Sequence, residues 1–478
     1  MDTITRWNEV ALRANRISHT FAGGTQLGPT LSSRALAIVH LAIYDAYAAV
    51  LGNPATLPAY LPGLPAAPSG ATTSDAVAGA AYTTLVALYP AQTADFDNDL
   101  ATMGNPASPG HTFGVAVANA LLADRAGDPG ASGPYTPTLT RGHHRPDPDN
   151  PTQGYHGPVY GQARGFAITK RHALDAPPFD NPEYVDAVRE VRREGIRPDL
   201  LATLPDDFFK KRREMDHAVI GVWWAYDGVA NLGTPPRLYN QILHVIAAAK
   251  GNTEAQNARL FALMNVAMGD AGILSWEQKY KWNFWRPVLG VREHDPAFGP
   301  TPTESDNNLD NTTDPFWLPY ASPRTNAVNP AFPPPAGGTK NFTPPFPAYP
   351  SGHATFGAAA FQIVRRFYGI AANQNGNDNL LDGLSFISDE FNGINQDNTG
   401  TIRPNHKRDF PGGLWNMIVE NAVSRVYLGV HWVFDAFTRR NNGQPDLNRK
   451  IGGVPLGLDI ANDIFDSGMK RSSVGPLP

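Results

Sequence analysis

The sequence predicts an all-α protein whose helices are joined by long loops. Apolar residues recur at the three- and four-residue spacing of helices in segments spread along the chain. No segment shows the apolar–polar alternation that is typical of a half-buried strand. The 44 prolines and 45 glycines are frequent between the periodic segments, where they favour turns and irregular backbone.

The expected helices each carry a local signal. The helix over residues 33–51 is rich in alanine and has one apolar stripe. Thr253, with Gln256 three residues later, forms a capping box that predicts the start of a long helix running towards Tyr280. The remaining expected helices cover residues 74–89, 112–125, 181–193, 208–225, 236–249, 354–368 and 414–434.

Four segments have little periodicity and are expected to be loops: residues 54–70, 127–166, 296–349 and 370–411. The tail beyond Arg440 is expected to be rich in turns. Loops of such length in compact proteins are usually functional or disordered. The second loop contains three histidines, for which an ordered surface loop is favoured and a zinc site is the alternative. They are His143, His144 and His156.

The composition excludes several classes of protein. The 39 basic residues nearly balance the 44 acidic ones, so neither a nucleic acid nor a membrane surface is expected as a partner. The absence of cysteine excludes disulfides and thiolate metal sites. The first seven residues resemble no conventional signal peptide, and no apolar run predicts a transmembrane helix. We expect a soluble protein; whether it is secreted or cytoplasmic stays open, as does its oligomeric state.

The tetrapeptide Pro-Ser-Gly-His at residues 350–353 is where the predicted chemistry begins. Proline disfavours helix before it, and the next expected helix starts directly after it. Free N–H groups and the dipole of a helix N-terminus hold anions. Gly352 allows close backbone approach to a ligand, and His353 can exchange protons near neutral pH. Ser351 can bind an oxygen or only cap the helix; this stretch alone leaves both open.

Lys279 and Arg286 place two cations in a tryptophan-rich segment. They are seven residues apart, close to two helical turns, so they point the same way if this segment is helical. Read alone, the segment is also compatible with an interfacial helix that has no ligand.

A third stretch carries Arg425, His431 and Asp435. The histidine and the aspartate are four residues apart, so the carboxylate can orient the imidazole from one turn away. Arg425 precedes His431 by six residues, roughly 120° around a straight helix. Either the long arginine reaches across, or Gly429 bends the backbone.

The three stretches combine into one predicted anion site. The cations Lys279, Arg286 and Arg425 would surround a tetrahedral oxyanion, and the backbone amides of residues 351 and 352 would add oriented dipoles. His431 would place a neutral nitrogen at one apex, and His353 would move protons. Such a set suits a highly charged oxyanion such as phosphate or vanadate.

These motifs also resemble a known family. Lys-(six residues)-Arg-Pro, Pro-Ser-Gly-His and Ser-Arg-(five residues)-His-(three residues)-Asp occur in this order, with all eleven specified positions present. They resemble the signature shared by vanadium-dependent haloperoxidases and type 2 phosphatidic-acid-phosphatase-like acid phosphatases. Residues 223–240, 271–293, 346–367 and 424–436 further resemble the fungal vanadium chloroperoxidases, with a weaker likeness over residues 145–161.

The resemblance implies one vanadate per chain as cofactor. His431 would be the axial ligand of vanadium, with Asp435 behind it. The equatorial oxygens of the vanadate would accept hydrogen bonds from five residues, which are Lys279, Arg286, Ser351, Gly352 and Arg425.

The resemblance also implies catalytic roles. His353 would be the acid–base catalyst, and Lys279 would polarise a peroxide oxygen. Asp227 matches a carboxylate that pairs with an arginine, here Arg425. Trp276 and Phe346 match apolar positions near the halide site, and phenylalanine at the second position resembles the chloroperoxidase choice.

The implied architecture is two packed four-helix bundles with long Pro/Gly-rich loops, the active site lying in the C-terminal bundle. We place the boundary between an N-terminal bundle, residues 1–205, and a C-terminal bundle, residues 206–478. The implied reaction is vanadate-dependent oxidation of halide by hydrogen peroxide to hypohalous acid. Bromide is the expected halide and chloride the second candidate, with an organic acceptor left open.

Two other functions remain open at this point. A phosphomonoesterase could use the same oxyanion pocket, with His431 as a nucleophile that forms a phosphohistidine. A helical protein without catalytic activity could store or sense an oxyanion. The chain length, the absence of membrane helices and the flanks around Trp276 and Phe346 favour the haloperoxidase.

Overall fold

The computed structural model describes residues 1–205, 213–300, 312–333 and 337–477. The N-terminal half contains α1 (Thr3–Ser18), α2 (Gly28–Leu51), α3 (Thr73–Leu88), α4 (Thr93–Met103), α5 (Pro109–Asp124) and α6 (Pro182–Glu194). The C-terminal half contains α8 (Met215–Trp223), α9 (Pro235–Ala249), α10 (Glu254–Trp282), α11 (Pro287–Arg292), α12 (Gly352–Phe367), α13 (Gly413–Tyr427), α14 (Val433–Ala436) and α15 (Gly453–Ser467). A short antiparallel pair, β1 (Ser385–Ile387) and β2 (Lys407–Asp409), aligns Phe386 with Arg408.

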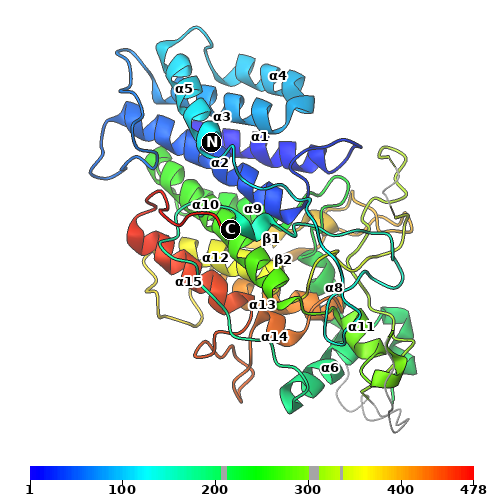
Figure 1. The fold of residues 1–478 in the computed structure, drawn as a ribbon. Helices are drawn as coiled ribbons and strands as arrows, with labels where there is room; N and C mark the ends of the chain where they lie inside the picture. Colours follow the sequence, from blue (N-terminus) through cyan, green and yellow to red (C-terminus); the bar gives the residue numbers. More distant parts are fainter. Residues whose placement is uncertain (206–212, 301–311, 334–336, 478) are drawn as a thin grey trace.

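The helices form layers around one long central helix. α10 lies between the N-terminal helices α1–α5 and the C-terminal helices α12, α13 and α15 (Figure 1). α2 packs along α10 on one side, and α12 packs against α10 on the other. The main apolar core continues from Ile4 to Met469 across these layers, and a small second cluster lies around Leu428. The division into two four-helix bundles near residue 205 stays a prediction.

Most of the expected helices are confirmed, including the capping box of α10. Gln256 donates its backbone N–H to Oγ1 of Thr253 at 3.3 Å, and the side chain of Gln256 accepts from the N–H of Thr253 at 2.8 Å. The helix expected over residues 208–225 is seen as α8, while residues 206–212 lie outside the described part of the chain.

The expectation of a turn-rich tail was wrong, because the buried helix α15 follows residue 452. Its glycines and Pro455 suggested a loop, but a proline in the first turn leaves the helical hydrogen bonds intact. The helices α1 and α4 were also missed. The helix expected over residues 414–434 is interrupted, since α13 ends at Tyr427 and α14 starts at Val433.

The close approach of α15 to α12 depends on a glycine. A Cβ atom built on Gly457 would lie 2.4 Å from the backbone oxygen of Thr355 and 2.7 Å from Cβ of Ala358. We expect Gly457→Ala to lower the free energy of unfolding by about 1–3 kcal/mol, because backbone would have to shift. Chemical denaturation measures this. Gly127→Ala, where a Cβ meets nothing within 4 Å, is the control; equal stability of both variants would contradict the packing argument.

Within the described residues, α2 is the one helix that is long and apolar enough to span a membrane by length and composition alone. Of its most apolar window, 78% is buried inside the protein, against α3 and α10. The helices of protein cores meet the same criteria, and α2 occupies such a position here.

Candidate active site

Lys279 and Arg286 converge although they do not share a helix. α10 ends at Trp282, and Asn283 adopts a left-handed conformation with φ of 49°. Arg286 then lies in extended backbone as the residue before α11. The condition under which helical spacing would align the two cations, a helix through the whole segment, is not met. The turn at Asn283, rather than helical spacing, places the guanidinium beside the site.

Gly429 bends the chain between Arg425 and His431, which decides between the two alternatives left open by the sequence. Its φ is +71°, a conformation that L side chains rarely adopt. A Cβ atom there would lie 2.6 Å from the backbone oxygen of Gly195. Arg425 therefore projects from the last turn of α13, while His431 lies in the turn before α14.

His431 is held in a single orientation by a carboxylate and a guanidinium. Its Nδ1–H donates to Oδ2 of Asp435 at 2.7 Å, and Nη1 of Arg286 donates to Nε2 at 2.9 Å. Asp435 also accepts from the backbone N–H of Trp432 at 3.0 Å. Burial lowers the pKa of His431 well below its ordinary value, with Arg286 adding to this effect. The imidazole is therefore neutral, with its lone pair on Nε2.

Arg425 is paired with Asp227, as expected. Nη1 and Nη2 donate to the two carboxylate oxygens at 2.9 and 2.8 Å, and Nη2 also donates to Oγ of Ser322 at 3.1 Å. The Arg425 side chain is 1% exposed and the Asp227 side chain 7% exposed. A bidentate pair of this kind fixes the plane of the guanidinium.

His353 lies in the first turn of α12 and faces the same site. Its Nε2–H donates to the backbone oxygen of Ala225 at 2.7 Å, which leaves Nδ1 as the basic nitrogen. Burial, together with the charge of Arg425, lowers the pKa of His353 to about 3. The neutral ring is thus available as a base at any ordinary pH.

The residues at the start of α12 differ in one respect from the sequence-based expectation. The backbone N–H of Ser351 donates to the backbone oxygen of Asp435 at 2.8 Å, so it is not free for an anion. Ser351 instead offers its hydroxyl, which caps α12 by a long contact of 3.4 Å to the N–H of Ala354. Gly352, the first residue of α12, lines the cavity described below.

Lys279 is fully buried behind the site. Its ammonium donates to the backbone oxygens of Pro347 and Ala348 at 2.9 and 3.0 Å, and to that of Pro350. Burial lowers its pKa well below the ordinary value, and Arg286 adds to this effect. Lys279 therefore holds the loop before α12 in place. This differs from the sequence-based expectation, in which its amine would donate to an oxygen of the anion.

The residues predicted for halide binding are in contact. The rings of Trp276 and Phe346 have centroids 4.8 Å apart. His156, from the N-terminal half, completes this aromatic wall at 6.0 Å from Trp276 and 6.1 Å from Phe346. From the sequence, His156 was expected only to be part of a histidine-rich loop, and no motif predicted that it would contact Trp276 and Phe346.

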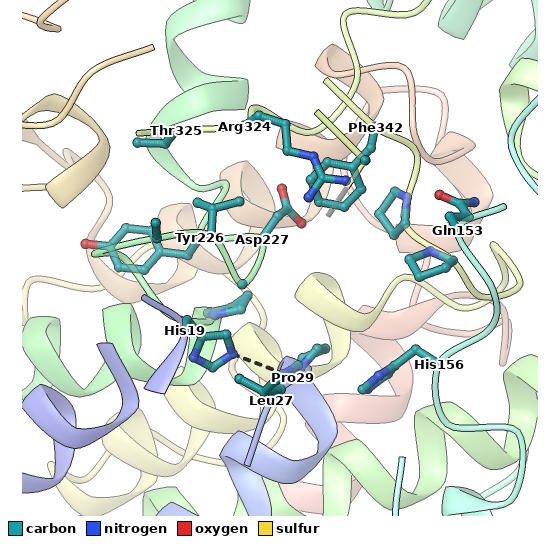
Figure 2. Close-up of a pocket in the computed structure, with 18 of the residues that line it drawn as sticks. His19, Leu27, Pro29, Gln153, His156, Tyr226, Asp227, Arg324, Thr325 and Phe342 are labelled. Atoms are coloured by element: carbon teal, nitrogen blue, oxygen red, sulfur yellow. Dashed lines mark hydrogen bonds between the residues drawn. The ribbon is translucent and has the colours of Figure 1, made fainter. Parts of the chain in front are cut away.

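A cavity of about 830 Å³ connects these groups to the surface. Its inner end is lined by Arg425, His431, Gly352, His353 and the halide residues, whereas Lys279 and Arg286 lie behind the wall. Figure 2 shows the part of the lining that we call the outer part of the cavity. Arg324, Asp227 and Phe342 lie on one side of it, and His19 and His156 lie on the other.

The alternative of a zinc site is not supported within the described residues. His144 is buried beside Tyr135 and Tyr155, and His156 lies in the cavity wall. Among all the residues that the structure describes, the one group of three that is close enough to share a metal ion does not include these histidines. It consists of Glu214, Asp216 and His217.

Comparison with known proteins decides the family. The profile of the vanadium chloroperoxidase N-terminal domain matches residues 2–154, and that of the second helical-bundle domain of the same protein matches residues 259–445. The vanadium chloroperoxidase of Curvularia inaequalis is 34% identical over 591 aligned positions, which cover 99% of this chain and 91% of the relative. The chain belongs to the vanadium chloroperoxidase family. Its match to the family extends well beyond the three motifs.

Solved structures with the same fold include three of bacterial vanadium-dependent haloperoxidases. A bacterial vanadium-dependent iodoperoxidase has a TM-score of 0.59 at 17% identity and covers 97% of this chain and 95% of its own. The holo form of a bacterial vanadium-dependent chloroperoxidase has a TM-score of 0.56 at 15% identity, covering 93% and 92%. The apo form scores 0.56 at 14% identity, covering 94% and 96%. These likenesses establish the mostly helical fold.

The residues at the inner end of the cavity, together with Arg286 directly behind its wall, fit the oxyanion expected of this family. Nη2 of Arg286 and Nε of Arg425 are buried and have no hydrogen-bond partner within the described residues. A buried donor without a partner costs about 1–3 kcal/mol, which an anion accepting from it would recover. Free donors, a neutral Nε2 and surrounding cations together favour an oxyanion over a cation or a neutral ligand.

Proposed function

We propose that this chain is a haloperoxidase that uses hydrogen peroxide and vanadate to oxidise bromide, and chloride as a second substrate. The observation that carries the proposal is the neutral, oriented Nε2 of His431 facing Arg286, next to the paired guanidinium of Arg425. A single nitrogen ligand within a shell of cations matches what vanadate requires. Family membership supports halide oxidation, and the geometry supports the assignment of residues.

Vanadate would be held at Nε2 of His431 by the guanidinium groups of Arg286 and Arg425, the hydroxyl of Ser351 and the start of α12. When bound, it supplies a Lewis-acid centre at which hydrogen peroxide becomes electrophilic towards halide. Burial lowers the pKa of Lys279, and a bound anion would raise it again, because a neighbouring negative charge favours the ammonium. Lys279 would then add positive charge from behind the wall. Asp227 keeps Arg425 in the orientation that this shell needs.

His353 would handle the protons of the reaction. Its Nε2–H stays on the backbone oxygen of Ala225, so Nδ1 accepts a proton from hydrogen peroxide and returns it to the leaving oxygen. The low pKa of the free ring rises when an anion neutralises the nearby cations, because a neighbouring negative charge favours imidazolium. The histidine can then both accept and release a proton near neutral pH.

Trp276, Phe346 and His156 would receive the halide. Two aromatic rings exclude water from one side, and the cations Lys279 and Arg286 lie 5.1 and 4.9 Å from the centroid of Phe346. A poorly hydrated anion such as bromide fits a site that is apolar and lies beside positive charge. The preference for bromide over chloride remains part of the proposal.

The decisive experiment removes and restores vanadate. Protein freed of vanadate should consume no peroxide with bromide, and added orthovanadate should restore consumption until one vanadate per chain is bound. Chloride and iodide are assayed in parallel. Halide oxidation without vanadate would refute the proposal. Hydrolysis of p-nitrophenyl phosphate by the vanadate-free protein, with no halide oxidation after loading, would instead favour the phosphomonoesterase.

A further inference from the structure

The cavity is far larger than halide and peroxide require. Its volume is about 830 Å³, whereas a molecule of the size of water takes up about 30 Å³. Cavities of about 300–1,000 Å³ typically enclose an organic ligand. The outer part therefore has room for a substrate that the oxidation of halide does not use.

Arg324 is an unpaired cation in this outer part. Its guanidinium carbon lies 4.0 Å from the ring centroid of Phe342, and its Nε is buried without a hydrogen-bond partner. Within the described residues, the guanidinium forms no ion pair and no hydrogen bond. Asp227 is the acidic residue that acts on it electrostatically, but both oxygens of that carboxylate are already bound by Arg425. The terminal nitrogens of Arg324 are thus available to a ligand.

The walls around Arg324 combine flat apolar surfaces with few polar groups. Phe342 lies on one side of the cavity, and Leu27 and Pro29 lie on the side across it (Figure 2). Pro344 and Pro345 also line the cavity. A guanidinium binds a carboxylate through two parallel hydrogen bonds, and flat apolar walls accept an aromatic ring. The cavity also reaches the halide residues without interruption.

We infer that the outer half of the cavity binds an aromatic carboxylate through Arg324, and that the ring of this acceptor is halogenated while it is bound. The inference rests on the proposed function, which supplies hypohalous acid at the inner end. A carbon of the ring bonds to the halogen as the halogen–oxygen bond breaks. The ring then loses its proton, which joins the released hydroxide to give water. One halide, one peroxide and one acceptor are thereby consumed.

The test compares 4-hydroxybenzoate with its methyl ester, which presents the same ring without the charge. In Arg324→Gln we expect the KM for 4-hydroxybenzoate to rise about tenfold or more, as for a lost hydrogen bond to a charged group. The KM for the ester should change by less than about twofold, because the ester makes no ionic contact. Arg324→Lys should recover part of the affinity. Arg440→Gln, at a side chain that is 51% exposed, is the matched control.

Calorimetric titration of the vanadate-loaded protein with 4-hydroxybenzoate, without peroxide, reports binding independently of turnover. Saturable binding that is weakened in Arg324→Gln would support the inference. If wild type, variant and reagent hypobromous acid brominate the two acceptors in the same ratio, the acceptors meet the oxidant in solution and the inference is wrong. A raised KM for bromide alone would also overturn it. Failure of the proposed function would show separately, as absent bromide oxidation with no acceptor present.

Discussion

Replacing His431 by alanine should abolish vanadate binding and, with it, halide oxidation. Nε2 of His431 is a neutral side-chain nitrogen at the inner end of the cavity, and its ring is held by Asp435 at Nδ1 and by Arg286 at Nε2. Without it, the oxyanion would be held by hydrogen bonds alone. We expect vanadate affinity to fall by at least about 100-fold, beyond the 10–100-fold typical of a lost supporting residue.

Equilibrium dialysis against vanadate measures this loss, and bromide-dependent peroxide consumption follows it. Asp435→Asn should give an intermediate effect, because the Nδ1–H of His431 would lose a charged acceptor while the ring stays in place. His406→Ala, which removes an exposed histidine, is the control for the substitution itself. Wild-type affinity in His431→Ala would show that vanadate is bound elsewhere.

The convergence of the candidate site residues could be predicted because chemistry restricts their types and their spacing. Three cations, a helix N-terminus and a carboxylate–histidine pair are the groups that a bound oxyanion needs. The pairing of Asp227 with Arg425 was implied by the family resemblance rather than by the three motifs, and it is observed. Such residues are recognisable in one sequence since few other side chains could replace them.

The path of the backbone between these residues was harder to predict. Asn283 and Gly429 end two helices through left-handed conformations, and each lies inside an apolar pattern that continues past it. Periodicity reports which residues are buried and does not report where hydrogen bonding stops. The acceptor for the N–H of Ser351 comes from Asp435, more than eighty residues away, and no local signal could reveal it.

The position of Arg324 in the cavity could not be predicted from the sequence, for a different reason. It lies in a long loop without periodicity, and its sequence neighbours carry no motif. Only the fold places it across from α2 and over Phe342, at the cavity that leads to His353. Substrate choice in this family member would then depend on loop residues, which can vary without disturbing the helices that hold the oxyanion.

Replacing His353 by alanine should separate chemistry from cofactor binding. Among the described residues, the ring is held by backbone groups of Ala225 and Trp224 and makes no hydrogen bond to His431 or Arg286. We therefore expect vanadate affinity to change only a few-fold. Halide oxidation should fall by about 10²–10⁴-fold, the usual contribution of a general acid–base residue.

The pH dependence gives this prediction its sharpest form. Burial lowers the pKa of His353 to about 3 in the absence of an anion, so its titration near neutral pH requires bound vanadate. In the wild type, kcat should therefore show a limb that follows this raised pKa, and the limb should vanish in His353→Ala. Steady-state rates from pH 4 to 9 and a vanadate dialysis at each pH provide the comparison. An unchanged profile in the variant, with unchanged vanadate affinity, would assign the proton transfer to another group, because proton transfer at Nδ1 is the role that we propose for this histidine.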